Sequence, residues 1–121
     1  MTNNHFRVIV AGTRTFADYA LLENKLDRLL SGKENVQIIS GGAFGADALG
    51  ERYAKDRNLP LVVILADWNA FGRSAGPIRN RKMAEQADAL VAFWDGRSKG
   101  TKNMIDTANE LGLQVRVVQV L

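Results

Sequence analysis

The sequence predicts one α/β domain, a Rossmann-like three-layer α/β/α sandwich with about five mainly parallel strands. Short apolar runs alternate along the chain with segments of helical periodicity, and most of these runs are apolar on both faces. Strands that are covered on both sides belong to a parallel sheet flanked by helices. A chain of 121 residues is the length of one such domain, so we expect a single domain over residues 1–121.

Five runs rich in Val, Ile, Leu and Ala predict the strands. They span residues 6–11, 36–39, 61–65, 89–94 and 115–120. The third run reads Leu-Val-Val-Ile-Leu and is too apolar to leave a face in contact with water.

Apolar residues at helical spacing predict a helix in each of the four intervals between these runs. The first begins after Asp18, a plausible N-cap, and ends before Gly32, a plausible stop. The others span about 44–57, 78–86 and 101–111. Residues 66–77 are expected to be irregular, and a loop of this length in a small domain is usually functional or mobile.

The residue counts exclude several kinds of chemistry. The chain has no Cys and a single His, His5, so disulfides, thiolate nucleophiles, Ser-His-Asp triads and multi-His zinc sites are not available. We therefore expect no metal and no cofactor. Residues 1–5 are polar, and no apolar run approaches the roughly 20 residues of a membrane span. These features favour a cytoplasmic protein without contact to a membrane.

The net charge of +3 is unevenly distributed. Residues 73–102 contain seven basic and three acidic residues, whereas the rest of the chain contains nine basic and ten acidic residues. The basic part of the sequence thus falls on two of the segments expected at the ligand-binding edge. An excess of positive charge permits an anionic ligand.

Ligands of open parallel sheets bind at the carboxyl ends of the strands, where the strand order reverses. Four segments follow predicted strands: 12–14, 40–47, 66–81 and 95–103. In the first, Gly12 allows a sharp turn, Thr13 offers a hydroxyl and Arg14 can hold a phosphate or carboxylate. An ordinary strand-to-helix turn with a surface arginine fits this segment equally well.

The second segment, Ser40-Gly41-Gly42-Ala43-Phe44-Gly45-Ala46-Asp47, resembles a phosphate-binding loop in principle. Its glycines allow backbone amides to approach an anion, and the helix that follows adds its positive end. It is neither a Walker loop nor a Gly-x-Gly-x-x-Gly loop. Asp47 could cap amides or accept from a ribose hydroxyl. The alternative is that the glycines only make a tight turn and allow close packing.

The third and fourth segments hold further candidates. Trp68 could stack on a base, and Arg79 or Arg81 could hold phosphates. The alternative is that the aromatics anchor the loop and the arginines form a solvated face. We favour the functional interpretation, because the segment contains no acidic residue after Asp67. In the fourth segment, Gly100 precedes Thr101, which could cap a helix or bind phosphate. An ordinary capped helix explains this segment as well.

Together these motifs resemble the SLOG superfamily, and more narrowly its small YspA-related (cpYpsA-related) members. The motifs are Val8–Arg14, Ser40–Asp47, Gly76–Met83 and Gly100-Thr101, in that order. The superfamily also contains the Lonely Guy phosphoribohydrolases and the DprA-type DNA-processing proteins. The resemblance implies a SLOG-like domain that binds nucleotides or molecules derived from them.

The resemblance to the Lonely Guy enzymes covers their binding motif better than their catalytic motif. An ungapped match places Arg79 on their catalytic arginine. Their glutamate, three residues after Gly-Thr, corresponds to Met104 here. A thioether cannot act as a general base or stabilise an oxocarbenium ion. We therefore place binding ahead of catalysis. The alternative is an N-glycosidase that acts on nucleoside monophosphates, with Arg79 as its catalytic residue. In that enzyme Asp47, Glu51 or Asp67 would substitute for the glutamate.

The resemblance to DprA-type proteins leaves another alternative, the binding of single-stranded DNA. Ser40–Asp47 and Arg79-Asn80-Arg81 match their Ser-Gly-x-x-x-Gly-x-Asp and Arg-Asn-Arg stretches. Trp68 and the basic residues after it could supply a short basic track with stacking aromatics. A homodimer or higher homo-oligomer would lengthen this track.

Our main hypothesis is a protein that senses or sequesters a nucleotide or an ADP-ribose-like molecule. Amides of Gly41, Gly42 and Gly45 would contact phosphate, and Arg14, Arg79 and Arg81 would neutralise it. Thr101 would take a second phosphate or a ribose, Asp47 a ribose hydroxyl, and Trp68 would cover a base. The full set of expected binding residues is Gly12, Thr13, Arg14, Ser40, Gly41, Gly42, Ala43, Gly45, Asp47, Asp67, Trp68, Gly76, Pro77, Arg79, Asn80, Arg81, Gly100 and Thr101.

Overall fold

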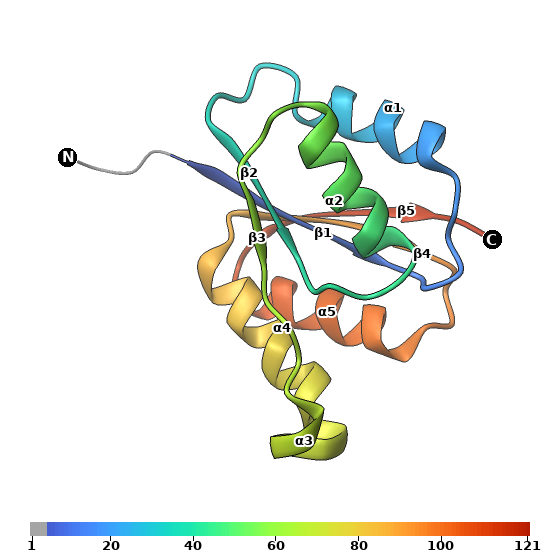
Figure 1. Ribbon diagram of the computed structural model, residues 1–121, viewed down its shortest axis with the longest axis vertical. Coiled ribbons are helices and arrows are strands. Elements are labelled where there is room, and N and C mark those ends of the chain that lie inside the picture. Colours follow the sequence, from blue (N-terminus) through green and yellow to red (C-terminus); the bar gives the residue numbers. More distant parts are fainter. Residues whose placement is uncertain (1–4) are drawn as a thin grey trace.

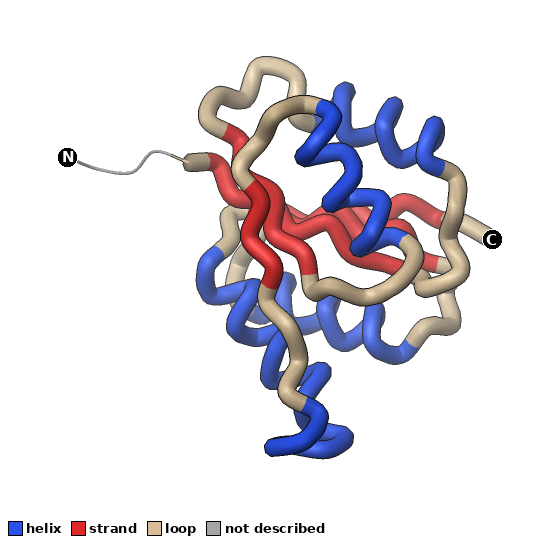
Figure 2. Tube along the Cα trace, viewed as in Figure 1, coloured by secondary structure: helices blue, strands red, loops and turns tan. Residues whose placement is uncertain are grey.

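A computed structural model describes residues 5–121 and shows a five-stranded parallel sheet between two layers of helices (Figures 1 and 2). The strand order is β3-β2-β1-β4-β5. The strands are β1 (Phe6–Gly12), β2 (Val36–Ser40), β3 (Leu61–Val63), β4 (Ala89–Trp94) and β5 (Gln114–Gln119). The predicted Rossmann-like fold class is confirmed. Residues 1–4 of the expected domain lie outside the described residues.

The helices divide between the two faces of the sheet. Figure 1 shows α1 (Tyr19–Leu29) and α2 (Ala46–Asp56) on one face, and α4 (Ala75–Gln86) and α5 (Lys99–Glu110) on the other. Alternate residues of the central strand fill the two cores: Val8 and Val10 pack toward α1 and α2, Ile9 and Ala11 toward α4 and α5. This alternation follows from the two-residue period of a strand. None of the helices between residues 5 and 121 is long and apolar enough to cross a membrane.

The sheet order creates a switch point between β1 and β4. From β1 the chain moves outward through β2 to β3, then crosses to the other side of β1 for β4 and β5. Gly12 pairs with Phe93, so β1 and β4 end at the same level. The loops that follow these two strands therefore diverge from a common point, where ligands of such sheets bind.

The second helix begins two residues later than expected, and the third strand ends two residues earlier. Gly45 has φ +75° and ψ −125°, which is not helical, so α2 starts at Ala46 and Phe44 is left 79% exposed. The prediction that residues 61–65 have no face in water is wrong. β3 is an edge strand of three residues, and Leu65, just beyond it, is 70% exposed.

The segment 66–77 is not irregular as expected. It contains α3 (Trp68–Phe71), the 3-10 turn Gly72–Ser74 and the first turn of α4. The Asp67 carboxylate accepts a hydrogen bond from the Ala70 amide at 3.0 Å and caps α3. Pro77 fits in the first turn of α4, where its missing amide proton costs nothing.

The last helix and strand also differ slightly from their predicted bounds. α5 begins at Lys99 rather than 101, so its N-cap is Ser98 and Thr101 lies inside its first turn. β5 spans Gln114–Gln119 and is largely exposed, because it forms the second edge of the sheet. Asp18 caps α1 as predicted, accepting from the Leu21 amide at 3.0 Å.

Candidate functional site

A pocket of about 380 Å³ lies at the carboxyl ends of β1 and β4, at the switch point. Three loops and three helices, α2, α4 and α5, contribute to it. Its lining residues are Ala11, Gly12, Thr13, Arg14, Thr15, Ala43, Asp47, Arg79, Asn80, Met83, Asp95, Ser98, Lys99, Gly100, Thr101 and Met104. The volume falls within the range of about 300–1,000 Å³ that is common for small-molecule sites.

The loop after β1 is fixed against the loop after β4. Gly12 has a positive φ, and a Cβ there would overlap the carbonyl oxygen of Phe93, so only glycine allows the two strands to end this close. The Thr13 amide donates to the Phe93 carbonyl at 2.9 Å, and the Thr13 hydroxyl accepts from the Asp95 amide at 3.0 Å. Thr13 is thus buried beneath the pocket and holds its two main loops together.

Asp95 organises the start of α5. Its Oδ1 accepts hydrogen bonds from the amides of Arg97 at 2.8 Å and Ser98 at 2.9 Å. These backbone bonds, with Ser98 first, keep the pKa of Asp95 below its usual value, so the carboxylate is ionised at neutral pH.

The first turn of α5 has unused hydrogen-bonding groups. The amides of Lys99, Gly100 and Thr101 have no acceptor within residues 5–121, as is usual at a helix start. Thr101 is only 6% exposed and lines the pocket. Its hydroxyl makes no hydrogen bond to the described residues, although every fully enclosed side-chain polar atom among them has a partner. We conclude that this hydroxyl opens into the pocket.

The glycine-rich loop after β2 uses its amides internally. The Gly42 amide donates to the Ser40 hydroxyl at 3.1 Å, and the Ala43 amide donates to Asp47 Oδ2 at 3.2 Å. Ser40 itself donates to Glu51 at 2.6 Å. The amide of Gly42, expected to face a phosphate, thus has a partner within the loop.

Asp47 and Arg79 lie side by side at the pocket wall. Asp47 is 5% exposed, and this burial raises the pKa of its carboxyl group. Arg79 Nη1 donates to the Gly41 carbonyl at 2.8 Å, and burial lowers the pKa of its guanidinium. A Cβ on Gly41 would lie 2.8 Å from Arg79 Nη1 and 2.9 Å from Asp47 Oδ2. Gly41 therefore makes room for both charged groups.

Asn80 connects α4 to α5 beside the pocket. Its Nδ2 donates to the Asn103 side chain at 2.9 Å and to the Gly100 carbonyl at 3.3 Å. Its Oδ1 accepts from Arg79 Nε at 3.0 Å. This buried amide fixes the guanidinium of Arg79 relative to the start of α5.

Nine of the residues expected from the sequence line the pocket and nine do not. Those that line it are Gly12, Thr13, Arg14, Ala43, Asp47, Arg79, Asn80, Gly100 and Thr101. Those that do not are Ser40, Gly41, Gly42, Gly45, Asp67, Trp68, Gly76, Pro77 and Arg81.

Two of the expected binding residues, Trp68 and Arg81, lie outside the pocket. Trp68 is 52% exposed on α3 and contacts the region of Gly76 rather than the pocket. Arg81 turns to the outer side of α4, where it pairs with Glu85 at 3.7 Å and Glu110 at 3.6 Å.

Seven lining residues were not among the expected binding residues: Ala11, Thr15, Met83, Asp95, Ser98, Lys99 and Met104. Asp95 and Ser98 could have been found, because Ser is a favoured N-cap and Asp commonly accepts from an amide two residues on. The resemblance placed Met83 in a motif and Met104 at the position of a glutamate, and the packing of α4 against α5 brings both to the pocket. Residues 5–121 contain no group of three His, Asp or Glu placed to hold a metal.

The comparisons with known proteins decide the family. The model of the "YspA, cpYpsA-related SLOG family" (YAcAr) matches residues 6–71, more than half of the chain. The chain belongs to this SLOG family. The Gene 61 protein of Mycobacterium phage D29 is 33% identical to this SLOG protein over 116 residues, which cover 90% of this chain and 93% of the phage protein.

Two solved structures share the fold of this SLOG protein. DNA processing protein A (DprA) from Streptococcus pneumoniae matches 95% of the chain with a TM-score of 0.74 and 18% identity. The chain spans 50% of that DprA chain. TM1055, a Northeast Structural Genomics Consortium target, matches 90% of the chain with a TM-score of 0.67 and 23% identity, over 71% of its own length. At these identities the likeness shows the fold.

Proposed function

We propose that the pocket binds a nucleotide or a nucleotide-derived molecule of the ADP-ribose type through its phosphate groups. The observation that carries this proposal is the first turn of α5. Three amides without acceptors and the hydroxyl of Thr101 open at the switch point, beside the positive end of the helix. Arg14 and Lys99 are exposed lining residues and add positive charge.

Arg79 and Asp47 give the proposed site a second recognition element. The Gly41 carbonyl and the Asn80 side chain hold the guanidinium of Arg79 in one orientation, facing the same pocket as the α5 amides. Fixed guanidinium groups favour phosphate and carboxylate oxygens. The Asp47 carboxylate lines the same pocket and can accept a hydrogen bond from a ribose hydroxyl.

The test is calorimetric titration with AMP, ADP-ribose, NAD and a cyclic dinucleotide. Thr101→Val removes the hydroxyl that faces the pocket and is expected to weaken binding of the best ligand at least tenfold. Thr107→Val is the matched control, because Thr107 is also buried on α5 but does not line the pocket. The proposal fails if folded protein binds none of these ligands at millimolar concentration, or if the two variants lose affinity equally.

Hydrolysis of a nucleoside monophosphate is the second candidate function. Arg79 and the buried carboxyl of Asp47 share the pocket with Met104, which lies where the resemblance to Lonely Guy enzymes expects a glutamate. Of the three substitutes expected from the sequence, Asp47, Glu51 and Asp67, only Asp47 lines the pocket. Chromatography of AMP after overnight incubation tests this. Release of adenine by the wild type, but not by Arg79→Ala or Asp47→Asn, would favour catalysis over binding alone.

The exposed aromatics on α3 favour a third candidate, binding of single-stranded nucleic acid. Trp68 and Phe71 are both about half exposed, and Arg73 follows them on the surface. Bases stack on such side chains, and basic residues contact the phosphates. The same surface could join two copies of the chain. Salt-sensitive binding of a 30-mer that Trp68→Ala abolishes supports nucleic-acid binding, whereas a dimer in sedimentation that Trp68→Ala dissociates supports self-association.

A further inference from the structure

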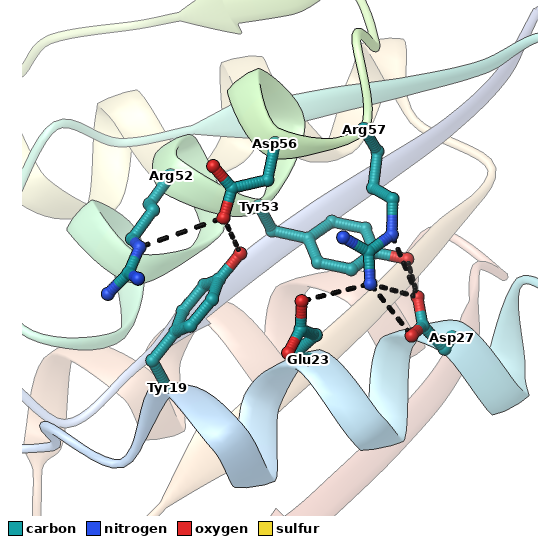
Figure 3. A network of polar contacts seen from close by, with 7 residues as sticks. All are labelled: Tyr19, Glu23, Asp27, Arg52, Tyr53, Asp56 and Arg57. Carbon is teal, nitrogen blue, oxygen red and sulfur yellow. Dashed lines mark hydrogen bonds and ion pairs between the residues drawn. The ribbon is translucent and has the colours of Figure 1, made fainter.

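The charged side chains of α1 are sorted onto two sides of the helix. Figure 3 shows the side that faces α2, with Tyr19, Glu23 and Asp27 one helical turn apart. Arg57 Nη2 contacts Asp27 at 2.9 Å and Glu23 at 3.0 Å. The hydroxyl of Tyr53 donates to Asp27 at 2.7 Å, and that of Tyr19 donates to Asp56 at 2.6 Å. The two acidic residues within α1, Glu23 and Asp27, are therefore both engaged with α2 or with Arg57, the residue that follows it.

The other side of α1 is basic and faces β5 across a groove of about 530 Å³, here called the α1–β5 groove. Its cations are Lys25 and Arg28 from α1 and Arg116 from β5. None of the three forms an ion pair within residues 5–121, and no acidic residue lines the groove. Apolar side chains complete the wall, with Leu21 and Leu29 on α1 and Val118 on β5.

The groove exists because one face of β5 lacks a helix. On the opposite face α5 packs against both β4 and β5. On this face the contacts of Figure 3 hold α1 beside α2. A smaller cavity of about 180 Å³ shares Leu29 and Arg116 with the groove and continues it toward Lys33, a fourth basic residue. The result is an elongated surface with an apolar floor and a basic rim.

We propose that the α1–β5 groove is a docking site for an acidic amphipathic helix of a partner protein. Charge complementarity selects this occupant: three cations without partners need acidic groups, and the apolar floor needs apolar side chains between them. The α1 of a second copy does not meet the requirement, because its Glu23 and Asp27 are already engaged with Arg57 and Tyr53. The floor of Leu21, Leu29 and Val118 favours a peptide over nucleic acid, whose backbone has no apolar groups to cover it.

The dimensions fit such a segment. β5 has six residues, which at the rise of a strand corresponds to about 20 Å. A helix of roughly 13 residues has the same length. The place it would occupy is that of the helix missing from this layer, directly over β5 and parallel to α1.

The experiment uses a synthetic helical peptide of this length with one leucine face and one glutamate face. Titration into ¹⁵N-labelled full-length protein is expected to shift amide signals of residues on α1 and β5 and to leave those of the pocket at Thr13 and Thr101 unchanged. A peptide with lysine in place of glutamate is the matched ligand control and is expected to cause no shifts. Binding should weaken as salt is raised, because exposed charges are screened.

Charge reversal in the protein separates docking from general attraction. The triple variant Lys25→Glu, Arg28→Glu, Arg116→Glu is expected to lose binding at least tenfold. The control variant Lys55→Glu, Arg73→Glu, Lys82→Glu makes the same charge change on exposed residues outside the groove and should retain binding. Equal losses in the two variants, shifts outside the groove, or no shifts at millimolar peptide would overturn the proposal. So would tighter binding of a single-stranded oligonucleotide to the groove, which would identify it as a nucleic-acid site.

Discussion

Gly45 joins the glycine-rich loop to α2, and a single methyl group at this position should destabilise the fold strongly. Its φ of +75° and ψ of −125° are almost restricted to glycine. A Cβ at this position would overlap the carbonyl oxygens of Thr13 and Arg14, which belong to the pocket loop after β1. The Thr13 carbonyl also accepts from the Ala46 amide at 3.3 Å, so α2 and this loop cannot separate without losing a hydrogen bond.

The expected cost of Gly45→Ala has two parts. Holding alanine in this backbone conformation costs about 1–3 kcal/mol. The overlap adds about 1–3 kcal/mol, because the obstructing atoms are backbone oxygens and not flexible side-chain ends. A total of about 4 kcal/mol is a large share of the 5–15 kcal/mol that stabilises a typical domain. It corresponds to a fall of roughly 15 °C in the melting temperature of a chain of this length.

Gly72→Ala is the control that isolates the overlap. Gly72 has φ +54° and ψ −129°, nearly the same conformation, but nothing lies within 4 Å of its Cβ position. Thermal unfolding followed by circular dichroism should show that Gly45→Ala loses at least about 1 kcal/mol more than Gly72→Ala. Equal losses would refute the argument that the close approach of α2 to the Thr13–Arg14 loop requires glycine.

Three further predictions concern buried or paired polar groups. Burial raises the pKa of Asp47 in the folded state. The contribution of Asp47 to stability is therefore present below about pH 4 and is lost as the pH rises through the folded-state pKa. Asp47→Asn should abolish this part of the pH dependence in urea unfolding. The hydrogen bond from Arg57 lowers the pKa of Asp27. Asp27 therefore stabilises the folded protein above about pH 4, and this stabilisation is lost on acidification. The stability of Asp27→Asn should not show this loss. Ser40→Ala should cost about 1–3 kcal/mol in the same assay, because the Gly42 amide and the Glu51 carboxylate lose a partner.

The elements of the fold could be predicted from the sequence, but the exposure of the edge strands could not. Apolar runs and helical spacing are local signals, and they placed all five strands and the four main helices. The run 61–65 is as apolar as the strand at 89–94, yet Val63 is 43% exposed whereas Phe93 is fully buried. The difference arises because β3 lies at the edge of the sheet and β4 inside it, and strand order is not encoded in the composition of a strand.

The candidate site could be predicted in part, for a related reason. Gly12, Thr13 and Thr101 line the pocket because they follow strands, and the ends of parallel strands meet at one edge. The sequence does not show in which direction an individual amide or side chain points. Two adjacent glycines indicate a loop that can turn its amides to an anion, but the Gly42 amide donates to Ser40 and the next amide, that of Ala43, donates to Asp47. Trp68 was expected at the site, whereas the cap by Asp67 directs it into α3.

Charge counted along the sequence is a poor guide to charge on the surface of this protein. Of the basic residues between 73 and 102, Arg81 pairs with Glu85 and Glu110, and Lys102 pairs with Asp106. The rest of the chain has a slight excess of acidic residues, yet Arg57 and α2 engage the acids of α1 and leave its cations on the α1–β5 groove unpaired. Attraction for an anion thus depends on which groups lack partners. In the pocket these are the amides and the hydroxyl at the start of α5, and in the groove they are the three cations.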